Sequence, residues 1–342
     1  MGGNTNTTDY TQTVPRSRRS GAGAGGGAGG RLADVLDDKN PEAREEIEEG
    51  YEHAADDVRI TERQGESINE RLESLDEVLE DGIPVKERHM IGSFTRGTMT
   101  GPFDENSDAD AMYVLNQGEY GRYLNQKNGN RNLLQRVKQV IENDPRYKES
   151  NVSIDRNAVV IEYHDMKVDV VPAFERSGGG YVIPDTHSEG QDWVKTNPRR
   201  YKQMFEAVNQ ARNGKLERFV RNVKSWNETH GKPYGSYHLE VMAYHHVRNQ
   251  AAKDKPLNET AEEFFDSLPE KTSKTRNPDA VRDPVYSDEI VDEYMDSENR
   301  QEAQEKAQAA QEKIKEARRL ERAGKTDEAK AKLEEVYGRN FD

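Results

Sequence analysis

The spacing of hydrophobic residues along the chain indicates where helices and strands lie. From residue 41 to 80, Ile60, Ile68, Leu72 and Leu79 recur near helical spacing among many charged residues. This pattern predicts one long amphipathic helix that buries a single hydrophobic stripe.

Shorter segments after this helix have the character of strands. Residues 85–94 and 108–115 are predicted to be neighbouring strands. Residues 152–163 and 166–174 alternate on either side of a turn, so they are expected to pair antiparallel beside the strand at 108–115. A helix over residues 133–141 should end before the next proline. Together these segments predict a small mixed sheet with helices behind it.

The glycines at residues 178–180 are predicted to separate this sheet from a helical second lobe. Asn197 precedes a proline, which makes a good helix start. Residues 216–226 carry hydrophobic side chains at helical spacing. Residues 297–320 are rich in Glu, Gln, Lys, Ala and Arg, so that helix is expected to be largely solvated, and Thr326 is expected to cap the last helix.

The predicted fold class is α+β, with three parts. Residues 1–31 are polar and then rich in Gly and Ala, and they are expected to be disordered because they can bury little hydrophobic surface. Residues 41–175 should form the lobe with the sheet and the long N-terminal helix. Residues 176–342 should form the helical lobe with the C-terminal helices. A chain of 342 residues can bury a substantial core in two such lobes.

Composition restricts the classes of function. The formal net charge is −15 at pH 7, which argues against broad, non-specific binding to nucleic acid. The chain contains no cysteine, which excludes disulfide bonds and zinc sites built from thiolates. No hydrophobic run approaches the ~20 residues that span a bilayer, and no signal peptide is visible. A cytoplasmic protein without membrane attachment is therefore expected.

Three aspartates are candidate metal ligands. Asp108 and Asp110 are two residues apart in a predicted strand, so both should point to the same face. Asp169 lies between Val168 and Val170 in another predicted strand. Carboxylate oxygens suit Mg²⁺, with Mn²⁺ as the alternative, and two ions roughly 3.5–4 Å apart would clamp the reacting oxygens of a phosphoryl displacement. One Asp-x-Asp alone is usually a solvated turn, so the prediction depends on all three aspartates.

Other candidate residues would hold a nucleotide. Gly92 and Ser93 supply a flexible turn whose N–H groups and hydroxyl suit the outer phosphates of a nucleoside triphosphate. Taken alone, Lys224 would be a surface lysine whose stem packs along a helix. Taken alone, Ser236 would be an N-cap.

Three core motifs of the chain are Gly92-Ser93-Phe94-Thr95-Arg96-Gly97-Thr98, Asp108-Ala109-Asp110 and Val168-Asp169-Val170-Val171-Pro172. They resemble the motifs of polymerase-β-type nucleotidyltransferases and, more narrowly, of the cGAS/DncV-like nucleotidyltransferases, or CD-NTases. The narrower resemblance rests on residues 181–185, Trp193 with residues 196–198, residues 223–227 and residues 236–240. It extends from about residue 60 to the C-terminus.

The resemblance implies roles for individual residues. The lysine and serine that match Lys224 and Ser236 contact the triphosphate in this family, and the tyrosine that matches Tyr237 stacks on the nucleobase. The three aspartates would hold two Mg²⁺ ions, and Asp169 would also help to deprotonate the acceptor ribose hydroxyl. The implied fold is a polymerase-β-type lobe with a helical second lobe.

The resemblance also implies a product and partners. Nucleoside triphosphates would be joined into a cyclic di- or trinucleotide, a second messenger of antiviral, CBASS-type defence that acts on a separate effector protein. No stable binding to nucleic acid is expected. Three alternatives stay open: an RNA-tailing enzyme of the CCA-adding or poly(A) type, a nucleotidyl-transferring toxin, and a nucleotide-binding regulator without catalytic activity.

Overall fold

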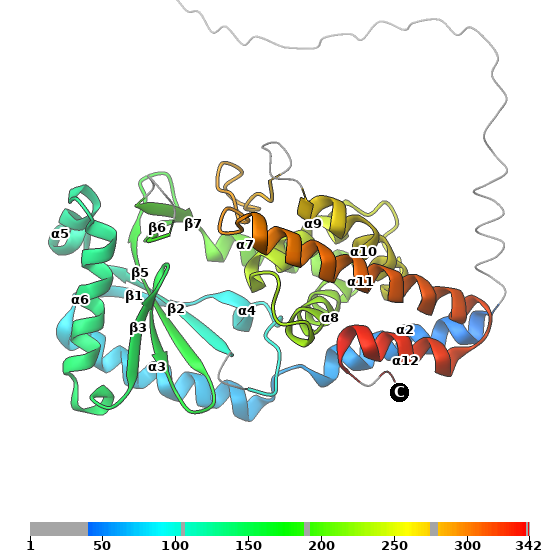
Figure 1. Ribbon diagram of the computed structural model, residues 1–342. Helices are drawn as coiled ribbons and strands as arrows, with labels where there is room; N and C mark the ends of the chain where they lie inside the picture. Colours follow the sequence, from blue (N-terminus) through cyan, green and yellow to red (C-terminus); the bar gives the residue numbers. More distant parts are fainter. Residues whose placement is uncertain (1–39, 104–106, 188–191, 274–279, 340, 342) are drawn as a thin grey trace, which may run out of the picture. The chain divides into compact units, whose positions relative to one another are not determined.

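The computed structural model describes residues 40–103, 107–187, 192–273, 280–339 and 341. The prediction of disorder for residues 1–31 lies outside this range. Residues 40–342 make up one compact unit. Its α+β fold, with a sheet and a separate group of helices, is the one predicted (Figure 1).

The prediction of a single helix over residues 41–80 is wrong, because the segment forms two helices. α2 (Pro41–Asp57) ends before a short connection, and α3 (Glu62–Gly82) begins after it. The break is fixed by a capping box, in which Thr61 Oγ1 accepts from the Gln64 backbone N–H at 3.3 Å and the Gln64 side chain accepts from the Thr61 backbone N–H at 2.8 Å. These two bonds satisfy N–H groups that a helix start leaves without partners.

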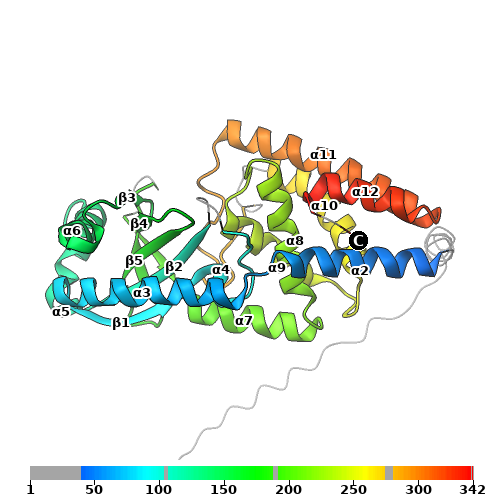
Figure 2. The same cartoon turned by 90° about the horizontal axis from the view of Figure 1, so that it is seen from below.

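The two helices pack in different hydrophobic cores. Ile47 and Tyr51 of α2 belong to the core of the helical lobe, whereas Ile68 and Leu72 of α3 belong to the core beneath the sheet. Figure 2 shows α2 among the helices of one lobe and α3 alongside the sheet of the other. The N-terminal helices therefore connect both lobes, and the predicted boundary at residues 175–176 stays a prediction.

The sheet is mixed, as predicted. Its main strand order is β1-β2-β5-β4-β3, formed by β1 (Val85–Met90), β2 (Asp108–Leu115), β5 (Lys167–Glu175), β4 (Ala158–Glu162) and β3 (Asn151–Asp155). β2 and β5 are parallel, and the other neighbours are antiparallel. The predicted strand at 152–163 is itself a hairpin, of which β4 pairs with β5.

The sheet continues beyond the glycines that were expected to end it. β6 (Tyr181–Pro184) pairs with β5, and β7 (Trp193–Thr196) pairs with β6. Both strands bring residues of the segment after the glycines to the first lobe. After these strands, the helices that join α2 in the second lobe begin at residue 198.

One face of the sheet is covered and the other is open to the functional site. α3 and α6 (Gly129–Asn143) pack against the covered face, which carries Ala109, Ala111, Val168 and Val170. Because side chains alternate along a strand, the acidic residues between these positions lie on the opposite face. The alternation predicted around Asp169 is thus observed. The remaining short helices of this lobe are α4 (Gly92–Thr95), α5 (Gln117–Tyr120), η1 (Gly121–Asn125) and η2 (Pro145–Tyr147).

The helical lobe is built around Trp226, which is fully buried. Its helices are α7 (Pro198–Ala211), α8 (Lys215–Thr229), α9 (Ser236–Asn249), α10 (Leu257–Ser273), α11 (Ser297–Arg322) and α12 (Thr326–Tyr337). Asn197 caps α7 as predicted, since its side chain accepts from the backbone N–H of Arg200.

Two expectations for the C-terminal helices are wrong. α11 is not largely solvated, because its alanines form a stripe against α10 and α12; the buried positions include Ala303, Ala307, Ala310 and Ala317. The side chain of Thr326 does not cap α12: Lys325 occupies the N-cap position, and no side chain makes a capping bond there. Alanine allows close approach of helices although its hydrophobicity is low, so composition alone underestimates this contact.

Candidate active site

The three candidate aspartates meet at the open face of the sheet. β2 and β5 are parallel neighbours in a register that places Asp110 opposite Asp169. Asp108 lies two residues before Asp110, and the three carboxylates offer oxygen atoms that lie within 4.8 Å of one another. This is the one group among the described residues in which three His, Asp or Glu side chains could share a metal ion. Three hard oxygen donors suit Mg²⁺ or Mn²⁺, so the donor set fits the predicted metal.

The electrostatics of this triad are those of crowded like charges. Burial, with the Asp108 charge as the next cause, raises the pKa of Asp110 to about 7. Burial and the charges of Asp110 and Asp108 raise the pKa of Asp169 to about 8. Among the described residues, no lysine, arginine or histidine forms a salt bridge with the triad. A bound cation would supply the charge that these carboxylates lack.

Gly92 occupies a position that only glycine can fill. Its φ of 70° is in the left-handed region, and a Cβ there would lie 1.9 Å from Asp110 Oδ2. The backbone N–H of Ile91 also donates to the Asp110 carbonyl at 3.0 Å. The turn is therefore fitted tightly against the triad and brings Ser93 beside it.

A cleft with a volume of about 370 Å³ lies above the triad, between the sheet and the helical lobe. The sequence-predicted residues that line it are Gly92, Ser93, Asp108, Asp110, Asp169, Lys224, Ser236 and Tyr237. Residues separated by up to 145 positions in the sequence thus line one cleft. The structure brings all eight candidates together, while their individual roles stay predictions.

Lys224 is a buried residue and not a surface lysine. Its side chain is 6% exposed, and Nζ donates to Glu240 Oε2 at 3.0 Å and to the Thr98 carbonyl at 3.2 Å. Glu240 also accepts from Arg96 Nε at 2.6 Å and from Thr98 Oγ1 at 2.8 Å. We call Arg96, Thr98, Lys224 and Glu240 the interlobe network, because it joins the turn after Ser93 to helices α8 and α9.

The charge of Glu240 is well compensated within this network. Burial alone would raise its pKa, but the charges of Arg96 and Lys224 and the hydrogen bonds from Arg96 and Thr98 lower it to about 2. The Arg96 guanidinium additionally lies over the Tyr201 ring, 5.0 Å from its centroid. The network thus holds the Lys224 ammonium in a fixed place at the cleft wall.

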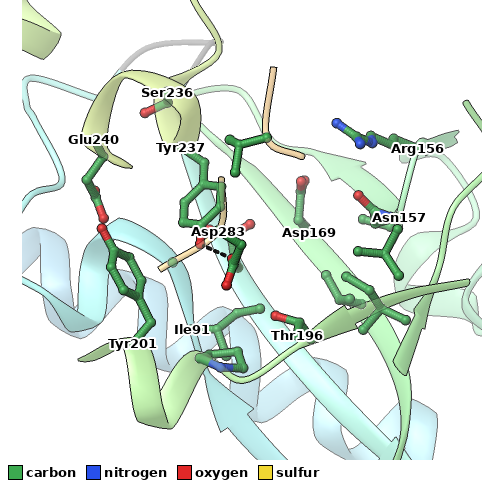
Figure 3. A pocket seen from close by; sticks show the side chains of 18 of the residues that line it. Ile91, Arg156, Asn157, Asp169, Thr196, Tyr201, Ser236, Tyr237, Glu240 and Asp283 are labelled. Carbon is green, nitrogen blue, oxygen red and sulfur yellow. Dashed lines mark hydrogen bonds between the residues drawn. The ribbon is translucent and has the colours of Figure 1, made fainter. Parts of the chain in front are cut away.

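Ser236 and Tyr237 lie at the start of α9, on the cleft side of the helical lobe (Figure 3). The N-cap position of α9 is taken by Gly235, and no side chain makes a capping bond there, so the N-cap role considered for Ser236 is wrong. The Tyr237 hydroxyl donates to Asp283 Oδ2 at 2.7 Å, and its ring meets the edge of Tyr201 at 5.7 Å between centroids.

Several residues of the cleft were not singled out from the sequence. Glu240 follows Ser236 by four positions and so lies on the same face of α9, which is a signal that sequence analysis could have used. Arg156 and Asn157, at the turn of the β3–β4 hairpin, form the wall beyond Asp169 (Figure 3). Asp283 comes from the connection between α10 and α11, where no periodic pattern marks it.

Comparison with known proteins gives a family match over part of the chain. Residues 46–209 match the model of the Second Messenger Oligonucleotide or Dinucleotide Synthetase domain, SMODS. The match covers 164 of the 342 residues, a little under half of the chain. The resemblance to CD-NTases inferred from the motifs is thereby confirmed.

A curated relative supports this assignment over a short region. The chain is 32% identical over 77 residues to the cyclic AMP-AMP-AMP synthase of an Acinetobacter species. The aligned region spans 22% of this chain and 22% of that relative, about a fifth of its length.

Solved structures show the same fold over nearly the whole chain. Escherichia coli MS115-1 CdnC with ATP aligns over 87% of this chain and 98% of its own, with a TM-score of 0.63 and 16% identity. Bradyrhizobium diazoefficiens CdnG in complex with GTP aligns over 85% and 98%, with a TM-score of 0.61 and 13% identity. Vibrio cholerae DncV cyclic AMP-GMP synthase aligns over 92% and 90%, with a TM-score of 0.57 and 16% identity. The predicted combination of a nucleotidyltransferase lobe and a helical lobe is confirmed.

None of the described helices is both long and hydrophobic enough to cross a membrane.

Proposed function

We propose that this chain is a metal-dependent cyclic oligonucleotide synthase that joins nucleoside triphosphates and releases pyrophosphate. The observation that carries the proposal is the meeting of two features in one cleft. Asp108, Asp110 and Asp169 gather at the sheet, and Lys224 and Ser236 line the same cleft from the helical lobe. A cation-binding end and a phosphate-binding end are what transfer of a nucleotidyl group requires.

The chain's own residues would perform three tasks. Ser93, Lys224 and Ser236 hold the donor triphosphate, with the Lys224 ammonium as the charged donor to phosphate oxygens. The triad would hold Mg²⁺, or Mn²⁺ in its place, and the ion would stabilise negative charge on the reacting phosphate. The acceptor ribose oxygen forms a bond to the α-phosphorus while the bond from the α-phosphorus to the leaving pyrophosphate oxygen breaks. Asp169 takes the proton of that ribose hydroxyl.

The position of Asp169 supports its role as the proton acceptor. The register of β2 and β5 places it opposite Asp110, and it lines the cleft beside the other triad residues. In the metal-free chain, burial and the neighbouring carboxylates raise its pKa to about 8, and a bound cation would lower that pKa and keep the carboxylate ionised. Positioning and electrostatic stabilisation supply the rest of the rate enhancement, without a covalent intermediate.

The product in our proposal is a cyclic di- or trinucleotide. One relative is a cyclic AMP-AMP-AMP synthase, and one structural neighbour is a cyclic AMP-GMP synthase. The messenger would serve a CBASS-type antiviral response by binding a separate effector protein. Its synthesis would occur in the cytoplasm and would need no nucleic acid.

One experiment tests the proposal. The chain is incubated with all four nucleoside triphosphates and Mg²⁺ or Mn²⁺, treated with phosphatase, and analysed by mass spectrometry. A closed ring has no terminal phosphate, so we expect phosphatase-resistant products without added RNA. Phosphatase-sensitive linear chains, or activity that appears only with tRNA, would favour an RNA-tailing enzyme instead.

A further inference from the structure

A strap of chain between α10 and α11 closes one side of the cleft. We define the strap as residues 281–293. Its residues that line the cleft are Asp283, Val285, Glu289, Ile290, Val291 and Glu293. Arg282 and Ile290 form an isolated antiparallel bridge across it, so the strap doubles back on itself.

The strap is fixed at both of its sides. Asp292 is buried, accepts from the Val281 backbone N–H at 2.9 Å and pairs with Arg300 at 2.9 Å. On the side of the sheet, the Tyr286 hydroxyl donates to the Gly179 carbonyl at 3.0 Å. A segment held by both lobes can keep a side chain at a defined point of the cleft.

The side chain at that point is Asp283, and its hydrogen bonds hold it in one orientation. Oδ1 accepts from the backbone N–H groups of Val285 and Tyr286, both at 2.8 Å. Oδ2 accepts from the Tyr237 hydroxyl at 2.7 Å. A carboxylate offers about four acceptor positions, and these three bonds leave one of them, on Oδ2.

Asp283 lies next to the hydroxyl end of Tyr237, whose ring is exposed in the cleft. Tyr237 is 39% exposed, and among the described residues Tyr201 is the one whose aromatic ring contacts the Tyr237 ring. Figure 3 shows Tyr237 and Asp283 side by side, joined by their hydrogen bond, with Asp169 across the cleft. The outer edge of a base stacked on the Tyr237 ring would therefore lie next to Asp283 Oδ2.

From this geometry we propose that Asp283 selects the donor nucleotide by its base, favouring adenine, cytosine and guanine over uracil. The proposal rests on the function proposed above and names its substrate class. The favoured bases each carry an exocyclic amino group, whose N–H can donate to the remaining position on Oδ2. The stacking tyrosine accepts any base, so the discrimination has to come from a polar neighbour.

Uracil fits this wall poorly for a specific reason. Its one N–H on the pairing edge is flanked by two carbonyl oxygens, which would approach the carboxylate oxygen lone pairs of Asp283. Glu293 lines the same side of the cleft, whereas Glu289 on that side is paired with Lys195 at 3.4 Å. The acceptors on this wall cannot donate hydrogen bonds to the carbonyl groups of uracil, which lose water on binding. Such missing hydrogen bonds discriminate strongly against uracil relative to a base that can donate to the wall.

Binding can be measured apart from turnover. The full chain is titrated calorimetrically, in the presence of Mg²⁺, with the α,β-methylene analogues of ATP, CTP, GTP and UTP, whose bridging carbon prevents cleavage. We expect the UTP analogue to bind at least about tenfold more weakly than each of the other three. Asp283→Asn should reduce this gap to about threefold or less, because the amide can donate to a uracil carbonyl.

Asp288→Asn is the matched control. Asp288 lies in the same strap, carries the same charge and pairs with Lys195, but it does not line the cleft. This variant should keep the wild-type gap. Three outcomes would overturn the selectivity proposal alone. The difference in affinity between the UTP analogue and the other analogues could be unchanged in Asp283→Asn, that variant could lose affinity equally for all four analogues, or the wild type could show no difference. If no analogue binds the wild-type chain, the proposed function fails as well.

Discussion

Two groups of partly or fully buried charges line the same cleft, and they are organised in opposite ways. The triad consists of three carboxylates that form no salt bridge with a basic residue among the described residues, and burial together with like charges raises the pKa of Asp110 and of Asp169. The interlobe network places Glu240 between Arg96 and Lys224 and lowers the pKa of Glu240. Both groups contain charges that would be costly to bury alone.

The difference indicates what each group does. In the interlobe network, the protein itself compensates the buried carboxylate, so the network can hold the two lobes and Lys224 in place without a ligand. In the triad, the protein leaves like charges in contact, so protons or a bound cation have to compensate them. The triad is therefore expected to depend on a metal ion, and the interlobe network is expected to matter for stability.

The largest expected effect comes from the triad. Asp110→Asn keeps the size of the side chain but removes a charged metal ligand. We expect pyrophosphate release to fall by at least about a thousandfold, since charge stabilisation at the reacting phosphate is lost. The thermal midpoint should be unchanged or higher, because like-charge repulsion is relieved.

Asp81→Asn provides the comparison for this substitution, since Asp81 is exposed near the end of α3, away from the cleft. It should leave pyrophosphate release near the wild-type rate. Turnover of Asp110→Asn close to that of wild type would contradict the metal assignment.

The next effect concerns stability and the other charge group. Glu240→Gln leaves Arg96 and Lys224 buried without a compensating charge. Breaking a buried ion pair in this way costs about 3–5 kcal/mol, so the free energy of unfolding measured with urea should fall by that amount. Glu335→Gln removes an exposed partner of Lys313 and Lys332 and should change the midpoint little. Equal effects of the two substitutions would mean that the interlobe network does not stabilise the fold.

A third substitution separates the two roles of Lys224. Lys224→Ala leaves Glu240 paired with Arg96, so the loss of stability should be smaller than for Glu240→Gln. Affinity for a non-cleavable ATP analogue should fall by about 1.5–3 kcal/mol, the usual value of a charge-assisted hydrogen bond. Titration calorimetry measures it. Unchanged affinity would leave Lys224 with a structural role only.

The triad could be predicted from the sequence because its signal is local. Alternation along β2 places Asp108 and Asp110 on one face, and the valines around Asp169 fix its direction in β5. The sequence predicted that the strand of Asp169 lies beside the strand of Asp108 and Asp110, but it did not predict that the two strands are parallel. Conversely, the break after α2 was missed although Thr61 and Gln64 have the spacing of a capping box, because the helical periodicity on both sides concealed it.

The interlobe network and the strap could not be predicted in the same way. Arg96 and Glu240 are 144 residues apart, and nothing in the pattern around either residue identifies the other as its partner. Asp283 lies in a connection without periodicity, and its position depends on bonds to Tyr237 and to the backbone of the strap. Such contacts are determined by how the lobes pack, which hydrophobic periodicity does not encode.

The smallest effect is a pH dependence that distinguishes the triad from the rest of the protein. The pKa values of Asp110 and Asp169, about 7 and about 8, are above the value of about 3.9 expected for an unfolded aspartate. Between pH 6.5 and 8.5 the metal-free folded chain therefore loses protons that the unfolded chain has already lost. Stability should fall as the pH rises through this window.

Other groups titrate outside this window or in the opposite direction. Burial lowers the pKa of His238 and of His246 to about 4. Both histidines therefore make the free energy of unfolding increase with pH up to about 6.5, and above that pH they add no further pH dependence. Glu240, with a pKa of about 2, affects stability only in acid. The decline above pH 6.5 is thus assigned to the triad, and Asp110→Asn should make it shallower.

Added Mg²⁺ should reverse this decline. The ion competes with protons for the carboxylates, so its stabilising effect should be larger at pH 8.5 than at pH 6.5. Scanning calorimetry of the wild type and of Asp110→Asn, with and without Mg²⁺ at both pH values, measures both the change of stability with pH and the stabilisation by Mg²⁺. A Mg²⁺ effect that is equal at the two pH values, or that survives in Asp110→Asn, would show that the ion binds elsewhere and that the triad is not its site.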